Sequence, residues 1–160
     1  MRAFRTLLQV VDTAAPLYFM DEAVFTSKQV SPKVWFCKQN EPVMIKRKKL
    51  TFTAIAVAAA IDMNGAVIAI HLKDHSIDSA AYCQFLDKVA AHTKGAPCTM
   101  LVDNLKVHRT DSVCALAAKH KIKLLYNGIY SSEYNPIERL WAWTKQRFTK
   151  RCIGNVPYHL

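Results

Sequence analysis

The sequence predicts a mixed α/β fold in which helices flank a five-stranded sheet of three antiparallel strands followed by parallel strands. Three observations lead to this prediction. Two β-type runs are joined by Asn64-Gly65, a strong hairpin signal. Apolar residues recur at helical spacing in three later segments. Short buried-strand runs alternate with those helices, and such an order favours parallel pairing.

The size and composition agree with one folded domain. The chain has 160 residues, of which 51% are hydrophobic and 21% charged, with only four Gly and six Pro. These values exclude collagen-like and low-complexity disordered chains. Twenty-two Lys and Arg against twelve Asp and Glu give a formal net charge of +10. The charge predicts a polyanionic partner, with a merely lysine-rich solvated surface as the alternative.

The first half of the chain reads as three strands. Residues 17–20 form an aromatic-rich apolar run that stops at Asp21-Glu22, and this predicts a buried strand. Residues 26–49 follow as a long basic connection with seven basic residues against Glu41. Connections of this length are usually functional or disordered. Residues 51–62 and 66–72 are the two β-type runs of the hairpin.

The second half alternates helices and strands. Residues 76–93 show one apolar helical face, with Ser76 or Asp78 able to cap its start. Residues 99–102 predict a buried strand, 111–119 a helix and 122–126 a fifth strand. Asn135-Pro136 then opens a helix that runs to about residue 150, with Asn as the cap and Pro at the first helical position.

Cysteine usage and hydropathy indicate a reducing, intracellular setting. The five cysteines are odd in number and form no C-x-x-C pair, which excludes a disulfide framework and a zinc ribbon. The apolar run within residues 1–11 is too short for a signal peptide. The most apolar stretch, 52–61, is about half the length that a bilayer requires, so no membrane association is expected.

Three carboxylates are candidates for chemistry. Asp21 and Asp103 each follow a buried strand run, and ligand groups collect at the carboxyl ends of parallel strands. If these strands are neighbours, the two Asp carboxylates converge, and all-oxygen ligands favour Mg²⁺ or Mn²⁺. Glu138 falls at the edge of the buried stripe of its helix, where a carboxylate can still face a cleft. Taken singly, each Asp could simply cap a turn. Glu138 could reach back to the helix cap, Asn135, in a capping box.

The combination resembles the catalytic core of mariner-type DDE transposases. The matching text is Phe19-Met20-Asp21-Glu22, the segment Asp103-Asn104 followed by His108, and YSSEYNPIERLW at 130–141. The resemblance covers roughly residues 17–150. It implies a ribonuclease-H-like fold and metal-dependent cleavage of DNA at transposon ends, with strand transfer into target DNA.

The resemblance also assigns roles to residues. Asp21 would bridge two Mg²⁺ ions (Mn²⁺ as a substitute), and Asp103 and Glu138 would each hold one of them. Two-metal sites place their ions about 3.5–4 Å apart, where they stabilise both oxygens of an in-line displacement. Asn104 and His108 would support the carboxylates. The family further implies double-stranded DNA as partner, a TA dinucleotide target and a homodimer in the active assembly.

Three departures from the family pattern stand out. Ser132 replaces a common Pro, and Glu133 is a second acid that precedes the helix and aligns with a non-catalytic position. Relatives also carry a helix-turn-helix module before the first Asp. We therefore interpret residues 1–16 as a remnant of an interdomain linker and 17–160 as the catalytic domain, with the basic loop 26–49 as an insertion.

Two basic clusters are candidates for DNA contact. The loop cluster is Lys46, Arg47, Lys48 and Lys49, which in relatives corresponds to a clamp; a solvated charged hairpin or a nuclear-import signal is the alternative. The helix cluster, Lys145 and Arg147, could instead only complement the helix dipole. The expected location is the nucleus in a eukaryote and the cytoplasm in a bacterium.

Two other functions remain open from the sequence. The chain could be a catalytically idle, truncated transposase-derived protein that binds DNA or acts as a scaffold. It could also be a ribonuclease-H-type nuclease that acts on hybrids, which the Asn-Pro-Ile-Glu stretch disfavours. The three acids favour the transposase.

Overall fold

Strands and helices alternate along the chain in the predicted order. The computed structural model describes residues 15–26, 54–127 and 135–153. The elements within them are β1 (Leu17–Thr26), β2 (Ala54–Ile61), β3 (Val67–Asp74), α2 (Ser79–Thr93), β4 (Cys98–Val102), η2 (Lys106–Arg109), α3 (Asp111–Lys119), β5 (Ile122–Tyr126) and α4 (Ile137–Ile153). The predictions for residues 1–11, the loop 27–49 and the motif residues 130–134 lie outside the described residues.

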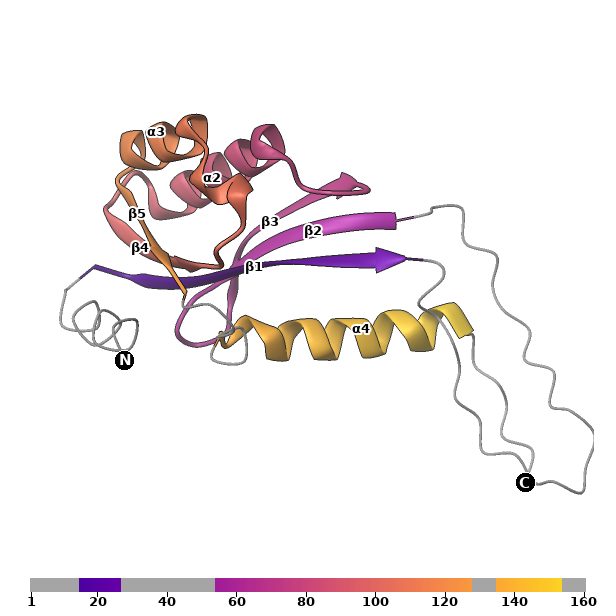
Figure 1. Ribbon diagram of the computed structural model, residues 1–160. Helices are drawn as coiled ribbons and strands as arrows, with labels where there is room; N and C mark the ends of the chain where they lie inside the picture. The colour runs from indigo at the N-terminus through magenta and orange to yellow at the C-terminus, as the bar shows by residue number, and fades with distance from the viewer. Residues whose placement is uncertain (1–14, 27–53, 128–134, 154–160) are drawn as a thin grey trace, which may run out of the picture.

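The five strands form one mixed sheet in the order β3-β2-β1-β4-β5. The β1–β2 and β2–β3 pairs are antiparallel, while β4 is parallel to both β1 and β5. Helices α2 and α3 lie over one face of the sheet, and α4 runs along the other face beneath β1 (Figure 1). The predicted fold class, three antiparallel strands followed by parallel strands with flanking helices, is confirmed.

The side chain of Asp62, a residue of the turn between β2 and β3, closes that turn. Oδ1 of Asp62 accepts hydrogen bonds from the backbone N–H of Asn64 at 2.9 Å and of Ala66 at 2.8 Å. Gly65 adopts a φ of 82°, which glycine reaches without the steric cost of a Cβ. The hairpin predicted from Asn64-Gly65 is therefore present.

The first strand is longer than its apolar run predicts. The sequence interpretation ends it at Asp21-Glu22, but β1 continues to Thr26. The reason is its pairing with β2, which extends in register from Phe19 to Thr26, with Ala23 and Phe25 buried. Asp21 and Glu22 are thus strand residues, and the prediction that Asp21 follows the strand is wrong.

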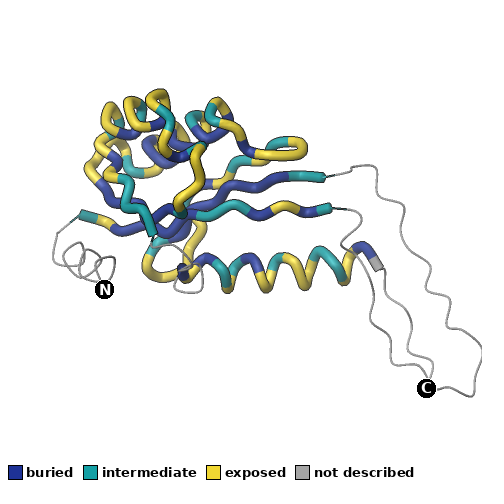
Figure 2. Tube along the Cα trace, viewed as in Figure 1, coloured by how far each residue is buried: buried dark blue, intermediate teal, exposed yellow. Residues whose placement is uncertain are grey.

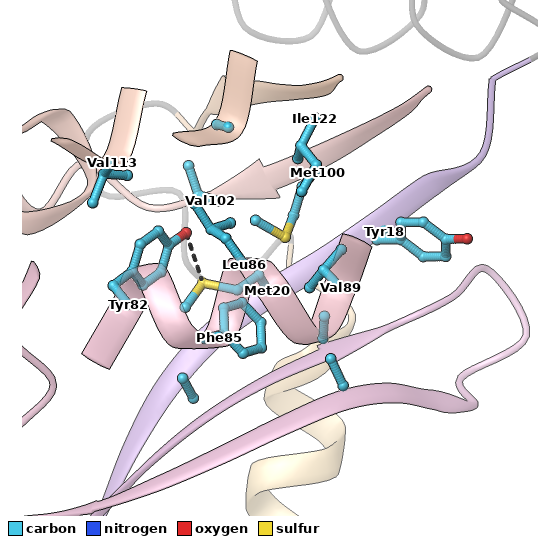
Figure 3. Packing of buried hydrophobic residues seen from close by; sticks show 14 of the residues in the cluster. Tyr18, Met20, Tyr82, Phe85, Leu86, Val89, Met100, Val102, Val113 and Ile122 are labelled. Carbon is cyan, nitrogen blue, oxygen red and sulfur yellow. Dashed lines mark hydrogen bonds between the residues drawn. The ribbon is translucent and has the colours of Figure 1, made fainter. Parts of the chain in front are cut away.

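Two apolar cores lie on the two faces of the sheet, because side chains alternate between faces along each strand. The larger core, between the sheet and α2 and α3, includes Tyr82, Phe85 and Met20 (Figure 3). The Tyr82 hydroxyl donates to the sulfur of Met20 at 3.7 Å. The smaller core lies against α4 and includes Ile137 and Trp141. Strands β1, β2 and β4 are mostly buried between them, while half of β3 and the outer faces of the helices are exposed (Figure 2).

The helix ends refine the predicted boundaries. Helix α2 starts at Ser79 because Asp78, not Ser76, is its cap and accepts from the Ala81 N–H at 2.9 Å. The short helix η2 was not predicted from the sequence. In the part of the chain that the structure describes, no helix combines the length and apolar composition that a membrane crossing requires.

Candidate active site

Asp21 and Asp103 each lie just beyond the paired part of the parallel β1–β4 pair. The last paired residues are Phe19 and Leu101, and continuing that register by two residues sets Asp21 against Asp103. Neighbouring strands are about 4.7–4.9 Å apart. Asp21 shares the strand parity of Phe19 and Ala23, whose side chains pack toward α4. Asp103 follows the last residue of β4, and its carboxylate contacts His108.

Burial raises the pKa of the Asp21 carboxyl to about 6, from an ordinary value of 3.8. The negative charges of Glu138 and Asp103 contribute to this rise, while hydrogen bonds from the Glu22 backbone and Trp141 oppose it. The Trp141 indole Nε1–H donates to Oδ2 of Asp21 at 3.0 Å. The charges of Glu138 and Asp103 therefore both act on Asp21.

Glu138 is positioned by the start of α4. Asn135 is buried, and its Nδ2 donates to the backbone oxygen of Met20 at 2.9 Å. Its Oδ1 accepts from the Ile137 N–H at 3.3 Å. One side chain thus both caps the helix and ties its first turn to the residue before Asp21. The predicted Asn-Pro opening is present, with the first helical turn beside β1.

Asp103 is held by its own loop and by a histidine. Its Oδ1 accepts from the Leu105 N–H at 3.1 Å and lies 2.8 Å from Nδ1 of His108. Burial disfavours ionisation of Asp103. The hydrogen bonds from His108 and Leu105 outweigh that effect, so the pKa of the carboxyl is below its ordinary value.

His108 joins this loop to β1 on the other face of the sheet. Its Nε2 lies 3.1 Å from Oε1 of Glu22, and only 1% of the residue is exposed. Burial lowers the pKa of His108, but the two carboxylates more than compensate and raise it to about 9. The ring also stacks on Tyr82 at 4.3 Å between centroids. An imidazolium here is matched by two negative charges.

Glu22 is the residue that sequence reasoning missed. It stands beside Asp21 in the matching motif. If the strand ended at Asp21, however, strand alternation would not say on which face of the sheet the Glu22 side chain lies. Because β1 continues, its side chain takes the opposite face from Asp21 and meets His108. The signal that could have found it was the strand alternation of Ala23 and Phe25, which are both apolar.

Asn104 supports the loop instead of touching the acids. Its Nδ2 donates to the backbone oxygen of Asn127 at the end of β5, and its Oδ1 accepts from the guanidinium of Arg109. That guanidinium stacks on the Tyr126 ring, 4.3 Å from the centroid. The Tyr126 hydroxyl in turn donates to the backbone oxygen of His108 at 2.9 Å. These contacts fix the loop that carries Asp103.

The donor set suits hard divalent cations. Asp21, Asp103 and Glu138 offer only oxygen, and the charges of Glu138 and Asp103 add to the effect of burial in raising the pKa of Asp21. Within residues 15–26, 54–127 and 135–153, however, no three His, Cys, Asp or Glu side chains are already gathered closely enough to hold a metal ion. The oxygen donors of these residues suit such ions.

The predicted basic contacts are only partly described. Lys145 and Arg147 are both exposed on α4, and the Arg147 guanidinium stacks on Trp143. Lys46, Arg47, Lys48 and Lys49 lie outside the described residues.

Comparison with known families gives one match along almost the whole chain. The sequence profile of the DDE superfamily endonucleases matches residues 16–157. No relative is found among curated protein sequences.

Comparison with solved structures finds the same architecture in DNA-transposition proteins. The Mos1 transposase paired-end complex with left transposon end superposes with a TM-score of 0.69 at 16% identity, over 91% of this chain and 46% of that one. The Mos1 catalytic domain with Raltegravir and Mg gives 0.64 at 14% identity, over 93% and 72%. A simian T-cell lymphotropic virus intasome gives 0.63 at 16% identity, over 92% and 45%. The chain thus spans about half of a Mos1 transposase chain, and the likeness confirms the ribonuclease-H-like fold.

Proposed function

Because this chain belongs to the DDE superfamily endonuclease family, we propose that it is the catalytic part of a DNA transposase. The proposed reaction is metal-dependent cleavage of phosphodiester bonds at transposon ends, followed by joining of the cut strand to target DNA. The observation that supports the proposal is the charge of Glu138 on α4 and of Asp103 after β4, which, together with burial, raises the pKa of Asp21 on β1.

The proposed ligands are Asp21, Asp103 and Glu138, with Asp21 shared between two Mg²⁺ or Mn²⁺ ions. When bound, such ions lower the pKa of a coordinated water or hydroxyl and neutralise charge on the leaving oxygen. A Mos1 catalytic-domain structure that contains Mg supports this choice of metal.

The protein's own contribution is orientation of the carboxylates. Trp141 holds one oxygen of Asp21, and the Leu105 N–H and His108 both hold Oδ1 of Asp103. His108 is itself fixed by Glu22 and Tyr82. Preorganised groups of this kind need no rearrangement at the moment of reaction, which is the main source of catalysis in phosphoryl transfer.

The proposed partner is double-stranded DNA, both transposon ends and target, with a homodimer as the active assembly. The charge of +10 supports a polyanionic substrate, and the pairing of ends in the Mos1 paired-end complex supports two protomers. We further propose a reducing, intracellular location. Cys83, Cys98, Cys114 and Cys152, the cysteines in the described part, are free thiols.

The test is cleavage of labelled duplex DNA that carries the inverted repeats flanking the gene, with the full chain and Mn²⁺ or Mg²⁺. Asp21→Asn, Asp103→Asn and Glu138→Gln should each reduce the cleavage rate by at least about a thousandfold. The exposed acid Asp74 is the matched control, and Asp74→Asn should cleave like the unchanged chain.

Three results would count against the proposal in different ways. Full cleavage by any one of the three variants removes that residue from the site. DNA binding without cleavage by the unchanged chain, with either metal, supports the idle DNA-binding protein. Cleavage confined to RNA–DNA hybrids supports the ribonuclease-H-type nuclease.

A further inference from the structure

A groove lies between the β2–β3 turn and the start of α4, two elements that lie side by side in the fold (Figure 1). Its volume is about 400 Å³, within the range of about 300–1,000 Å³ that is usual for clefts that bind a ligand. The apolar part of its lining consists of Ile61, Met63, Pro136, Leu140 and Trp143. The groove is therefore an apolar surface that two elements distant in sequence build together.

Two large apolar side chains of this groove are exposed. Met63 is 64% exposed and Trp143 is 53% exposed. The Arg147 guanidinium lies 4.2 Å from the centroid of the Trp143 ring, so the indole keeps this exposure despite that contact. Exposed apolar patches with a polar rim are typical of interaction sites, and Asp62 and Arg139 form such a rim here. The groove thus has the character of a docking surface for an apolar segment.

The chain enters the described fold next to this groove. Strand β1 begins at Leu17, two residues before Phe19, and Phe19 pairs with Ile61. Leu17 is buried in the same core as Ile61 and Leu140, which both line the groove. Residues 1–14, which lie outside the described residues, precede this point.

The sequence of residues 4–11 has the pattern that suits an apolar groove. Its apolar positions recur at i, i+3, i+4 and i+7, the spacing of the apolar stripe of an amphipathic helix. They are Phe4, Leu7, Leu8 and Val11. A helix this short has little stability alone in water, so the stripe needs an apolar partner.

The connection between this segment and the fold is short. Residues 12–15 separate Val11 from Pro16, whose backbone oxygen accepts from the Thr99 N–H at 2.9 Å. Four extended residues span at most about 13–14 Å. A short connection raises the effective concentration of a segment near its site to about the millimolar range, which favours docking within one chain over docking of a second copy.

We propose that residues 4–11 dock in the groove between the β2–β3 turn and α4, with their apolar stripe against Met63 and Trp143. The occupant is a segment of the same chain, and burial of apolar surface holds it there. The docked segment joins the turn to the first half of α4, the helix that carries Glu138. The inference goes beyond the proposed function and is independent of it, because neither DNA nor a metal ion takes part.

The first experiment is a mutant cycle in the full chain, measured by urea unfolding in EDTA. Met63→Ala should lower the equilibrium constant for folding about fivefold, because the docked segment covers this side chain. In a chain that also carries Leu7→Ser and Leu8→Ser, the same change should lower it by less than about 1.5-fold, because the segment no longer docks.

The cycle has a matched control on each side of the contact. Thr6→Ser with Gln9→Ser makes the same number of changes off the apolar stripe and should leave the Met63→Ala effect at about fivefold. Leu72→Ala changes another exposed apolar residue, 58% exposed and outside the groove. Its effect should be the same with and without the Leu7→Ser and Leu8→Ser changes, because distant sites add.

Three results overturn the proposal. A folding constant of Met63→Ala within about 1.5-fold of the unchanged chain shows that nothing covers the groove. An equal Met63→Ala effect with and without the Leu7→Ser and Leu8→Ser changes shows that another part of the protein covers it. An effect that grows over about a fiftyfold rise in protein concentration assigns the groove to a second copy of the chain.

The second experiment measures the groove in the folded protein and needs no unfolding. Acrylamide quenching of Trp143 is obtained as the difference between each full chain and the same chain with Trp143→Phe. Leu7→Ser with Leu8→Ser should raise the quenching constant of Trp143 about twofold, since undocking uncovers the ring, whereas Thr6→Ser with Gln9→Ser should leave it unchanged. Equal quenching in the two variants overturns the proposal, and the result does not depend on whether the chain cleaves DNA.

Discussion

His108 links the stability of the protein to pH. Its pKa is about 9 in the fold, against an ordinary value of 6.5, because Asp103 and Glu22 favour the charged form despite burial. A raised pKa means that the fold binds the proton more tightly than the unfolded chain does. The resulting stabilisation is complete below pH 6.5 and is lost as pH rises through 9.

We therefore expect His108→Gln to be most harmful at low pH. Without divalent cations, the variant should lose about 2–3 kcal/mol of unfolding free energy near pH 6 and much less near pH 9.5. Urea unfolding across this pH range measures the difference from the unchanged chain. His120→Gln, which removes a more exposed His–Asp pair, is the control and should show a small effect. A gap that is constant with pH would contradict the charged state of His108.

The pKa shift of Asp21 changes the stability of the fold with pH in the opposite direction. Burial and the charges of Glu138 and Asp103 raise its pKa from 3.8 to about 6, so its ionisation costs stability as pH rises from 3.8 to 6. Asp21→Asn should then be more stable than the unchanged chain above pH 6 in EDTA, by about 1 kcal/mol, since an Asn oxygen can still accept from Trp141. Thermal or urea unfolding near pH 7.5 measures this. A destabilised Asp21→Asn, with Asp74→Asn unchanged, would show that no repulsion is stored there.

At the scale of elements, much of the fold follows from local patterns. Asn64-Gly65 and Asn135-Pro136 predict a hairpin and a helix start because their backbone preferences do not depend on the rest of the chain. The extent of β1 depends on pairing with β2, a partner distant in sequence, and the polar pair Asp21-Glu22 conceals it. The same error hides Glu22, since strand alternation beyond Asp21 decides which face it takes.

The residues of the candidate site also fall into those that local sequence indicates and those that depend on contacts between elements. Asp21, Asp103 and Glu138 become candidates from sequence motifs alone, and their role stays a prediction. The residues that support them cannot be found in this way, because Trp141, Tyr82 and Tyr126 act through contacts between elements. Asn135 shows both aspects. Its capping role follows from sequence, but its hydrogen bond to the Met20 oxygen appears only once α4 packs beside β1.

Asn135 is therefore the residue through which α4 and β1 are held together near the acids. Asn135→Ala removes the cap and leaves a buried carbonyl oxygen unpaired, so the unfolding free energy should fall by about 2–3 kcal/mol. Asn135→Asp retains an acceptor for the Ile137 N–H but loses the amide donor, and should do comparable harm. Urea unfolding and amide exchange of the first α4 turn measure these effects. If Asn135→Asp behaved like the unchanged chain, the bond to Met20 would contribute nothing.

At the scale of the whole molecule, the two faces of the sheet carry different groups of residues. One face carries the larger core and the Glu22–His108 pair that positions Asp103, and the other faces α4 with Asp21 and Glu138. The acids sit where these layers meet, so a cation that neutralises them should stabilise the entire fold. Binding to the native state alone adds RT ln(1 + [L]/Kd), about 1.4 kcal/mol at ten times the dissociation constant.

Mg²⁺ or Mn²⁺ should accordingly raise the melting temperature of the unchanged chain by about 3–5 °C at such concentrations, because 1 kcal/mol corresponds to roughly 2–4 °C in a domain of this size. Asp21→Asn, Asp103→Asn and Glu138→Gln should each lose most of that shift, while Asp74→Asn should keep it. Asp21→Asn would then start higher in EDTA and gain little from the metal, whereas the unchanged chain starts lower and gains more. A differential scanning measurement with EDTA, Mg²⁺ and Ca²⁺ arms gives both quantities at once. Equal metal-induced shifts in all five proteins would place cation binding away from the three acids.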